Sequence, residues 1–413
     1  AAEARWAKGA PLGELDGVPT TIKDLVLTRG WPTLRGSQVI DGEGPWEEDG
    51  PPTARLREAG AVLIGKTTTP EFGWKAVTDC ALTGITRNPW ALDRTPGGSS
   101  GGAAAACALG MGALHVGSDG GGSIRIPAGF TGVVGLKPSF GRVPTAPPSP
   151  FATVSHVGPM TRSVPDAALM LNVLSQPDPR DWFALPYDGR DYLKGLDDGV
   201  RGLRVAFSPT LGFVDVDPEV AALVETAART FAELGAVVDE VPALFDDPRE
   251  IFRIHWYAGA AQALRGFSDE QRAHIDPGLV EIAEEGRRIT LLEYLQAAHE
   301  RALLGQTMRQ FHERYDLLLT PTLPIPAFEA GRELPEGHPG RRWFDWAPFS
   351  NPFNLTQQPA ASVPCGLTSA PLPVGLQIVG PMHDDALVLR AARAFERARP
   401  FHFPDEPRER AEP

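Results

Sequence analysis

The sequence predicts an α/β protein with a layered α/β/α architecture. Apolar runs of strand length recur along the chain, and amphipathic segments of helical length separate them, which is the alternation typical of layered α/β folds. The chain has 413 residues, of which 42% are hydrophobic, and this is enough apolar material for a substantial core. We therefore expect strands and helices to share one layered unit rather than to form separate all-α and all-β domains.

Seven apolar runs have the length expected of buried strands. They are residues 61–65, 113–117, 203–207, 236–241, 316–320, 361–365 and 374–379. A further short stretch with β-favouring residues precedes Lys23. These runs are the predicted strands of the central layer.

The clearest predicted helix spans residues 217–235. Asp217 can cap its first turn, Pro218 suits the first helical position, and Gly235 can end it. One face of this helix is apolar and consists of Val220, Val224, Ala227, Phe231 and Leu234. We expect this face to pack on the sheet.

The segment from about residue 246 to 314 reads as almost wholly helical. Its aromatic residues are expected to be mainly core residues; they include Trp256, Tyr257, Phe267 and Tyr294. Two loops flank the helical parts of the chain. Residues 141–152 contain four prolines and should form an extended loop, and the Gly- and Pro-rich stretch 331–340 should form a surface loop or a pocket lid.

Composition excludes several classes of protein. The formal net charge is −13 with acidic and basic residues interspersed, whereas nucleic-acid binding requires clustered Lys and Arg. No uninterrupted apolar run approaches the roughly 20 residues that span a bilayer, and residues 1–11 lack a signal-peptide core. The sequence therefore predicts a cytoplasmic protein that binds neither nucleic acid nor a membrane.

Cysteine and histidine spacing gives no sign of a disulfide framework or a metal site. The three cysteines, Cys80, Cys107 and Cys365, are far apart, and we expect them to be buried thiols. The nine histidines show no HxH or HExxH spacing. We expect no metal and no cofactor.

Two glycine-rich loops offer serine nucleophiles. Residues 97–102 read Gly-Gly-Ser-Ser-Gly-Gly, and residues 120–125 read Gly-Gly-Gly-Ser-Ile-Arg. Glycine lets a substrate approach the backbone closely, so N–H groups before a serine can face a developing oxyanion. The only histidine near either loop, His115, lies in an apolar run. Lys23 is the alternative base.

Lys23, Ser99 and Ser123, spaced by 76 and 24 residues, resemble the amidase signature family together with their flanking residues. The resemblance extends through residues 60–67, 70–73, 135–138, 156–159 and 373–380, and so covers almost the whole chain. It implies a single domain, 1–413, with a large central mixed β-sheet flanked by helices. The signature core would span about 12–175 and return at about 346–400. The variable helical region, about 246–345, would supply part of the substrate pocket.

The same resemblance implies an amidohydrolase. Ser123 would form an acyl-enzyme, Ser99 would relay the proton, and neutral Lys23 would be the general base. The peptide bond before Ser99 is typically cis in this family. Lysine has a reference pKa of about 10.4, and a base that works near pH 7 to 8 must be buried to lower it that far. Asp24 follows Lys23 directly, but adjacent side chains of a strand point to opposite faces.

The proposed oxyanion hole consists of backbone N–H groups, those of Gly120, Gly121, Gly122 and Ser123. The family commonly has Thr at the position of Gly120, so this chain lacks that hydroxyl. By resemblance Asp119 and Arg125 support the loop structurally. We expect Lys66, Lys137 and Gln377 to serve the scaffold by packing and hydrogen bonding.

Two other motifs match hydrolase or nucleotide-binding patterns by letter only. Residues 60–67 fit GxxxxGK[ST], but the four variable residues read as a buried strand rather than a phosphate-binding loop. Residues 97–101 fit the GxSxG elbow, which needs a strand directly before it, and residues 88–96 do not read as one.

Three functions remain open at this stage. A stand-alone enzyme that hydrolyses a small-molecule amide is the leading interpretation, and related enzymes are often homodimers. The first alternative is the glutaminase-type component of a tRNA-dependent amidotransferase, its A subunit, although that subgroup usually has Gln where this chain has Ile126. The second is a catalytically silent family member. We expect residues about 250–350 to form the pocket walls that select the amide. In the family the lysine usually follows a longer helical segment, of which residues 1–8 resemble a remnant.

Overall fold

A mixed sheet of ten strands forms the centre of the computed structural model, which describes residues 1–404. Its strands are β1 (Pro19–Lys23), β2 (Val62–Thr67), β5 (Leu114–Asp119), β6 (Val134–Lys137), β7 (His156–Thr161), β8 (Arg204–Phe207), β9 (Val237–Glu240), β10 (Leu317–Pro321), β11 (Ala360–Leu367) and β12 (Pro373–Val379). The strand order is β2-β1-β5-β7-β6-β11-β12-β10-β8-β9. Parallel pairs lie at the two ends of the sheet, and antiparallel pairs join β5 through β10 in its middle. A second sheet pairs β3 (Asp79–Cys80) with β4 (Gly84–Ile85).

The helices are distributed along the whole described chain. They are α1 (Ala2–Trp6), α2 (Pro51–Glu58), α3 (Gly101–Ala108), α4 (Arg125–Thr131), α5 (Val164–Leu174), α6 (Pro218–Glu233), α7 (Arg249–Ala263), α8 (Asp269–Arg272), α9 (Pro277–Arg288), α10 (Leu291–Phe311), α11 (Pro352–Leu355) and α12 (Asp385–Ala398). Short 3₁₀ turns are η1 (Glu71–Gly73), η2 (Ala152–Val154) and η3 (Trp343–Asp345). Among the described residues, no helix combines the length and the apolar composition needed to cross a membrane.

Different helices cover the two faces of the large sheet. On β5, Val116 packs in a cluster of buried side chains that includes residues of α5, α6 and α12. The next residue, Gly117, faces the opposite side, where Ile124 and Met160 pack with the alanines of α3. Because neighbouring residues of a strand point to opposite faces, this alternation separates two helical layers. The predicted single-domain α/β/α fold is thus confirmed.

All seven predicted strands of the sequence are present, as β2, β5 and β8 through β12. The predicted helix is also present as α6, and the Asp217 side chain accepts from the backbone N–H of Glu219 at 2.8 Å. Two central strands, β6 and β7, were not predicted. Their sequences contain Gly135, Gly158 and Pro159, which weaken a strand signal. Gly158 is needed there, because a Cβ on it would lie 2.2 Å from the carbonyl oxygen of Leu136 on the neighbouring strand.

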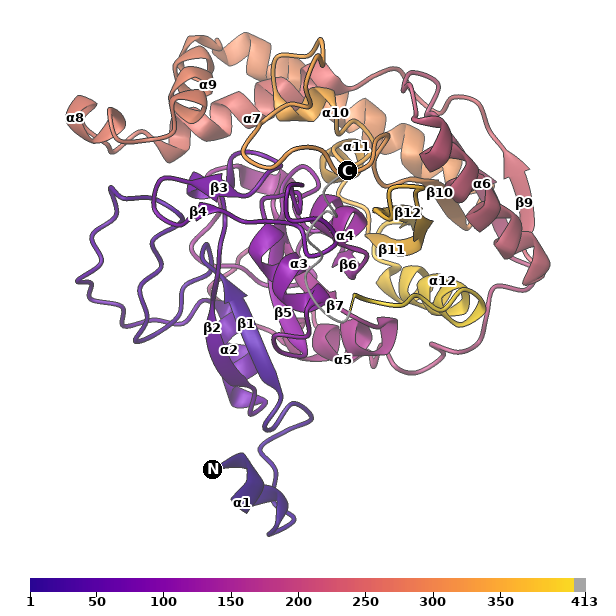
Figure 1. Cartoon of the computed structure of the whole chain (residues 1–413), viewed down its shortest axis with the longest axis horizontal. Coiled ribbons are helices and arrows are strands. Elements are labelled where there is room, and N and C mark those ends of the chain that lie inside the picture. Colours follow the sequence, from indigo (N-terminus) through magenta and orange to yellow (C-terminus); the bar gives the residue numbers. More distant parts are fainter. Residues whose placement is uncertain (405–413) are drawn as a thin grey trace.

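The predicted helical region forms α7 to α10, which gather on one side of the molecule, far from α1 and the amino terminus (Figure 1). Aromatic side chains fill the space beneath these helices. Trp256 of α7 is 2% exposed, stacks on Phe151 with ring centroids 4.0 Å apart, and packs edge-on against Trp343. This aromatic cluster borders the glycine-rich loop before Ser123, so it positions the site as well as the core.

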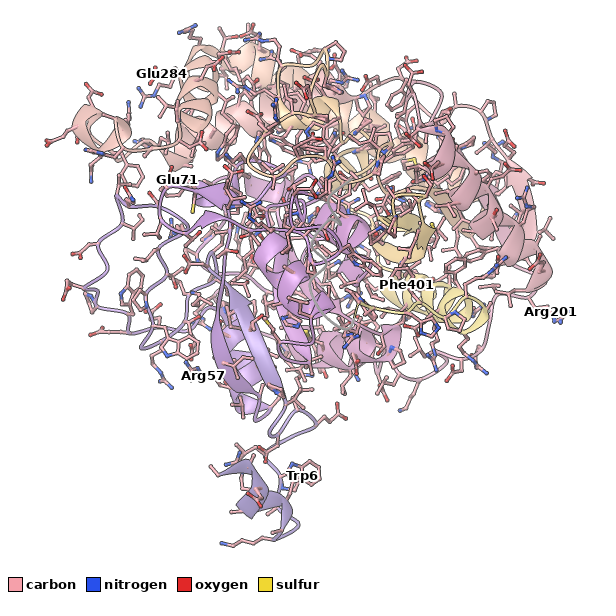
Figure 2. The ribbon with its side chains drawn as sticks, viewed as in Figure 1. Trp6, Arg57, Glu71, Arg201, Glu284 and Phe401 are labelled. Carbon is pink, nitrogen blue, oxygen red and sulfur yellow. The ribbon has the colours of Figure 1, made fainter. Side chains whose placement is uncertain are left out.

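At the opposite end, α1 is fastened to the loop before β1. Arg5 Nε donates to Asp16 at 2.7 Å, and the Trp6 indole donates to the Asp16 carbonyl oxygen at 2.9 Å. Figure 2 shows Trp6 at the outer end of the molecule, away from the sheet. The first helix therefore contacts the body of the protein mainly through Asp16.

Candidate active site

Lys23, the last residue of β1, lies in the interior between β2 and β5 and is fully buried. Its amine contacts three hydroxyl oxygens: Ser99 Oγ at 2.6 Å, Ser100 Oγ at 2.9 Å and Ser118 Oγ at 2.9 Å. The sequence predicted the contact with Ser99. Ser118, on β5, was not predicted, because a serine inside a strand carries no distinctive signal.

The surroundings of the Lys23 amine favour its neutral form. Burial lowers the pKa of Lys23 well below its usual value, and the charge of Asp119 opposes this effect without overcoming it. Asp24 does not pair with Lys23, because its carboxylate lies 3.5 Å from the amine of Lys66. The prediction that the two adjacent side chains avoid each other is thereby confirmed.

The hydrogen bonds around Lys23 distinguish the three hydroxyls. The Ser100 hydroxyl donates to the carbonyl oxygen of Ser118 at 3.1 Å, so its oxygen can only accept from the amine. A neutral amine has two hydrogens to donate and one lone pair. The Ser99 hydroxyl has the shortest contact with the amine and no other hydrogen-bond partner among the described residues. Ser99 is therefore the hydroxyl best placed to give its hydrogen to the amine.

The loop that contains Ser99 adjoins the loop that contains Ser123. The backbone N–H of Ser100 donates to the carbonyl oxygen of Ser123 at 3.1 Å, and the peptide bond between Gly98 and Ser99 is cis. Ser99 and Ser123 line one cavity, but in the part of the chain that the structure describes no hydrogen bond joins their hydroxyls. Of the three predicted residues, Lys23 and Ser99 are thus in contact, and Ser123 faces the same space.

Three of the four predicted oxyanion donors have free N–H groups. Within residues 1–404, no acceptor is bonded to the backbone N–H of Gly120, Gly121 or Ser123. Gly122 is the exception and corrects the prediction, because its N–H donates to Asp119 Oδ1 at 2.8 Å. Gly122 has a φ of 126°, a conformation that favours glycine, and its N–H is already used by Asp119.

A buried ion pair stabilises the loop of residues 120–123. Arg125 and Asp119 are both fully buried and approach to 2.9 Å. Burial alone would raise the pKa of Asp119, but the charge and hydrogen bonds of Arg125 outweigh it and hold that pKa well below its ordinary value. Arg125 also donates to Gln377 at 2.8 Å and to Asn354 at 2.7 Å, which places these side chains in the scaffold. Asn354 was not predicted, since it lies far away in sequence.

Gly120 makes room for the aromatic cluster. A Cβ at Gly120 would lie 2.9 Å from Trp256 Cζ3. Trp256 therefore occupies the space that a larger residue at position 120 would need. We expect Gly120→Thr to push the loop from its place and lower kcat/KM about 10- to 100-fold, since one oxyanion donor typically contributes up to about 4 kcal/mol. Steady-state kinetics on any amide substrate measure this change. Gly65→Thr is the matched control, because a Cβ at Gly65 meets nothing within 4 Å; equal kinetics for both variants would contradict the prediction.

The cavity that Ser99 and Ser123 share has a volume of about 170 Å³. Most of its wall is apolar. It comes from the segment after β1 with Leu25, from η1 with Phe72, and from the proline-rich loop with residues 145–151. The prediction that residues about 250–350 form the walls is wrong for most of the cavity, because Trp256 alone lines it from that region. The loop at residues 331–340 does not line the cavity, so it is a surface loop rather than a lid.

The structure contains neither a phosphate-binding loop at residues 60–67 nor a nucleophile elbow at residues 97–101. Residues 62–67 form strand β2, and the Lys66 amine donates to the Val26 carbonyl oxygen at 2.9 Å and to Thr33 at 2.7 Å. Residues 88–96 contain no strand, so Ser99 does not follow the strand that a GxSxG elbow requires.

The fold and this site fit an amide-hydrolysing enzyme, and comparisons with known proteins support that class. The family model described as Amidase matches residues 1–389, and the chain belongs to this family. It is 40% identical over 400 residues to an acylamidase from Rhodococcus erythropolis, covering 95% of this chain and 83% of the relative. It is also 37% identical over 429 residues to the A subunit of glutamyl-tRNA(Gln) amidotransferase from Myxococcus xanthus (strain DK1622), covering 97% of this chain and 87% of that relative.

A solved structure agrees with these sequence relationships. The crystal structure of a bacterial aryl acylamidase of the amidase signature family superposes with a TM-score of 0.88 at 34% identity, over 97% of this chain and 86% of the other. The predicted family, fold and amide-hydrolysing activity are therefore confirmed.

Proposed function

We propose that Lys23, Ser99 and Ser123 form the proton relay and nucleophile of amide hydrolysis. The observation that carries the proposal is the 2.6 Å contact between a fully buried amine and a hydroxyl that lines the cavity beside Ser123. Burial lowers the pKa of this amine, which favours the neutral form that a base needs. The amine takes the hydrogen of Ser99, Ser99 takes that of Ser123, and Ser123 Oγ attacks the amide carbon. Substrate binding must bring the Ser99 and Ser123 hydroxyls together, as catalytic hydrogen bonds often tighten only in the complex.

The tetrahedral intermediate places its negative oxygen at the loop before Ser123. The N–H groups of Gly120, Gly121 and Ser123 are the donors in this proposal, because they have no other acceptor among the described residues. Collapse of the intermediate breaks the C–N bond, and the proton held by Lys23 returns through Ser99 to the leaving amine. Water then enters and gives a proton to the same relay while its oxygen attacks the acyl carbon. The bond from that carbon to Ser123 Oγ breaks, the relay returns the proton to Ser123 Oγ, and the acid leaves.

The cavity favours amides with a neutral or anionic, largely apolar body. Its walls include Leu25, Phe72 and Trp256, and no Asp or Glu of residues 1–404 lines it. A substrate ammonium group would therefore lose its hydration without gaining a counter-ion. This argues for an acylamidase and against glutamine as the substrate. The names of two relatives, an acylamidase and an aryl acylamidase, support the same choice.

A panel of substrates tests this proposal. We expect the purified chain to hydrolyse acyl anilides and aliphatic amides with a kcat/KM at least about 100-fold above that for L-glutamine and amino-acid amides, since an unpaired buried charge costs several kcal/mol. Ammonia or aniline release measures each rate. Glutamine hydrolysis that exceeds anilide hydrolysis, or that appears only with added partner proteins, would favour the role in a tRNA-dependent amidotransferase instead.

We further propose a cytoplasmic enzyme that binds no nucleic acid, and a homodimer. The interspersed charges of the sequence support the lack of nucleic-acid binding, the lack of a long apolar run supports the location, and the dimer rests on resemblance alone. The domain bounds, with a signature core at about 12–175 and a return at about 346–400, likewise stay predictions. Size-exclusion chromatography with light scattering tests the dimer directly.

A further inference from the structure

We infer that Arg35 is a substrate-recognition residue, and that it binds a carboxylate carried by the amide substrate away from the scissile bond. The inference rests on the proposed function, because it assigns a ligand to the same cavity. Arg35 lines that cavity together with Ser99 and Ser123. Of the described residues that line the cavity, it is the only Lys or Arg.

The side chain of Arg35 is half-buried at the wall of the cavity. Among the residues that the structure describes, none forms a hydrogen bond or an ion pair with this side chain. The buried arginines Arg125 and Arg142, by contrast, pair with Asp119 at 2.9 Å and with Asp385 at 3.3 Å. A partly buried cation without a counter-ion is unfavourable, and an incoming anion would relieve that cost.

The nearest source of negative charge, Asp24, is already engaged. Its carboxylate lies 3.5 Å from the Lys66 amine and accepts the backbone N–H of Gly36 at 3.3 Å. Burial lowers the pKa of Arg35 and Asp24 opposes this, but a guanidinium keeps its proton in proteins. Asp24 therefore compensates the charge of Arg35 only in part, and no carboxylate among the described residues that line the cavity pairs with it.

The backbone fixes Arg35 beside the reaction centre. Arg35 has a φ of 55°, in the left-handed region that an arginine seldom adopts, and its carbonyl oxygen accepts the N–H of Phe72 at 2.7 Å. Gly73 follows directly and approaches Ser99 so closely that a Cβ on it would lie 3.2 Å from Ser99 Oγ. The short segment of Phe72 and Gly73 thus joins Arg35 to the serine relay.

These features together define a class of substrate. Apolar walls at Leu25 and Phe72 suit an alkyl or aryl body, and a cation at the wall suits an anionic end. A planar guanidinium binds a carboxylate through two parallel hydrogen bonds. The favoured substrates are amides whose apolar body ends in a carboxylate.

Two matched pairs of substrates test this inference and locate the carboxylate. In the first pair, adipic acid monoanilide carries a carboxylate on the acyl side, and hexananilide is its neutral counterpart. In the second pair, 4-acetamidobenzoate carries a carboxylate on the amine side, and 4-acetamidotoluene is its neutral counterpart. For at least one pair, we expect the wild type to have a higher kcat/KM for the carboxylate substrate than for its neutral counterpart. In Arg35→Met this ratio should fall by about 30-fold or more, mainly through KM. Arg35→Lys should retain part of the preference.

Arg201→Met is the control, because Arg201 is exposed at the far edge of the molecule (Figure 2). If Arg35→Met fails to fold, the wild-type enzyme still decides: rising NaCl should lower kcat/KM for the carboxylate substrate and leave the neutral one unaffected. A carboxylate preference that is absent in the wild type, or equal in wild type and Arg35→Met, overturns the inference. Failure of the wild type to hydrolyse either neutral anilide would instead contradict the proposed function.

Discussion

Ser123→Ala is expected to abolish amide hydrolysis, with a loss of kcat of about 10⁴-fold or more, as removal of a catalytic nucleophile does in other serine hydrolases. The change deletes one oxygen from a residue that is 4% exposed, and it leaves the backbone N–H donors in place. The fold should therefore survive. Steady-state kinetics and a thermal melt measure the two effects.

A fluorophosphonate probe adds a second measurement of the same prediction. Intact-mass analysis should show one adduct on the wild type and none on Ser123→Ala. Ser175→Ala is a suitable control, because Ser175 ends α5 and does not line the cavity. An adduct that persists in Ser123→Ala and disappears in Ser99→Ala would show that Ser99, rather than Ser123, is the nucleophile.

The parts of the site that the sequence predicted are those carried by residue type and spacing. Lys23 and Ser99 could be paired across 76 residues only because flanking residues matched a family, and their contact followed. Gly122 could not be separated from Gly120 and Gly121 in the same way. All four loop residues have an N–H group, and the sequence does not show which of them is already bonded. The backbone conformation of Gly122 lets its N–H donate to Asp119.

The cavity walls depend on tertiary placement that periodicity does not encode. The proline-rich loop at 145–151 has no repeating pattern, yet it supplies more of the wall than the whole helical region. Trp256 was expected to be a core residue, and it is both buried and part of the wall. Arg35 gave no signal at all, because a single arginine in a loop is ordinary until its missing partner is seen.

Lys23→Met is expected to lower kcat by about 10³-fold or more while the protein remains folded, because methionine fills similar space but cannot accept a proton. In the wild type, kcat/KM should rise with pH through an apparent pKa below the usual value for lysine, since burial lowers the pKa of Lys23 and only its neutral form is the base. The variant should lose this rising limb. A pH–rate profile for both proteins measures it.

Stability should change with pH in the same direction as activity. Between the lowered pKa of Lys23 in the folded protein and about 10.4 in the unfolded chain, the unfolded state binds one more proton at this site. The free energy of unfolding contributed by the site therefore rises with pH across that window. Lys23→Met removes this contribution, and urea titrations at several pH values detect the smaller slope.

Lys137→Met separates the catalytic effect from the effect of burial. Lys137 is also fully buried and burial likewise lowers its pKa, but its amine donates to the carbonyl oxygens of Gln358 and Pro138 and to none of the three serines around Lys23. Both variants should therefore flatten the dependence of stability on pH, because each removes a buried lysine. Only Lys23→Met should remove the rising limb of the pH–rate profile. If Lys137→Met removed that limb and Lys23→Met kept it, the base would be Lys137, and the contact between Lys23 and Ser99 would be structural.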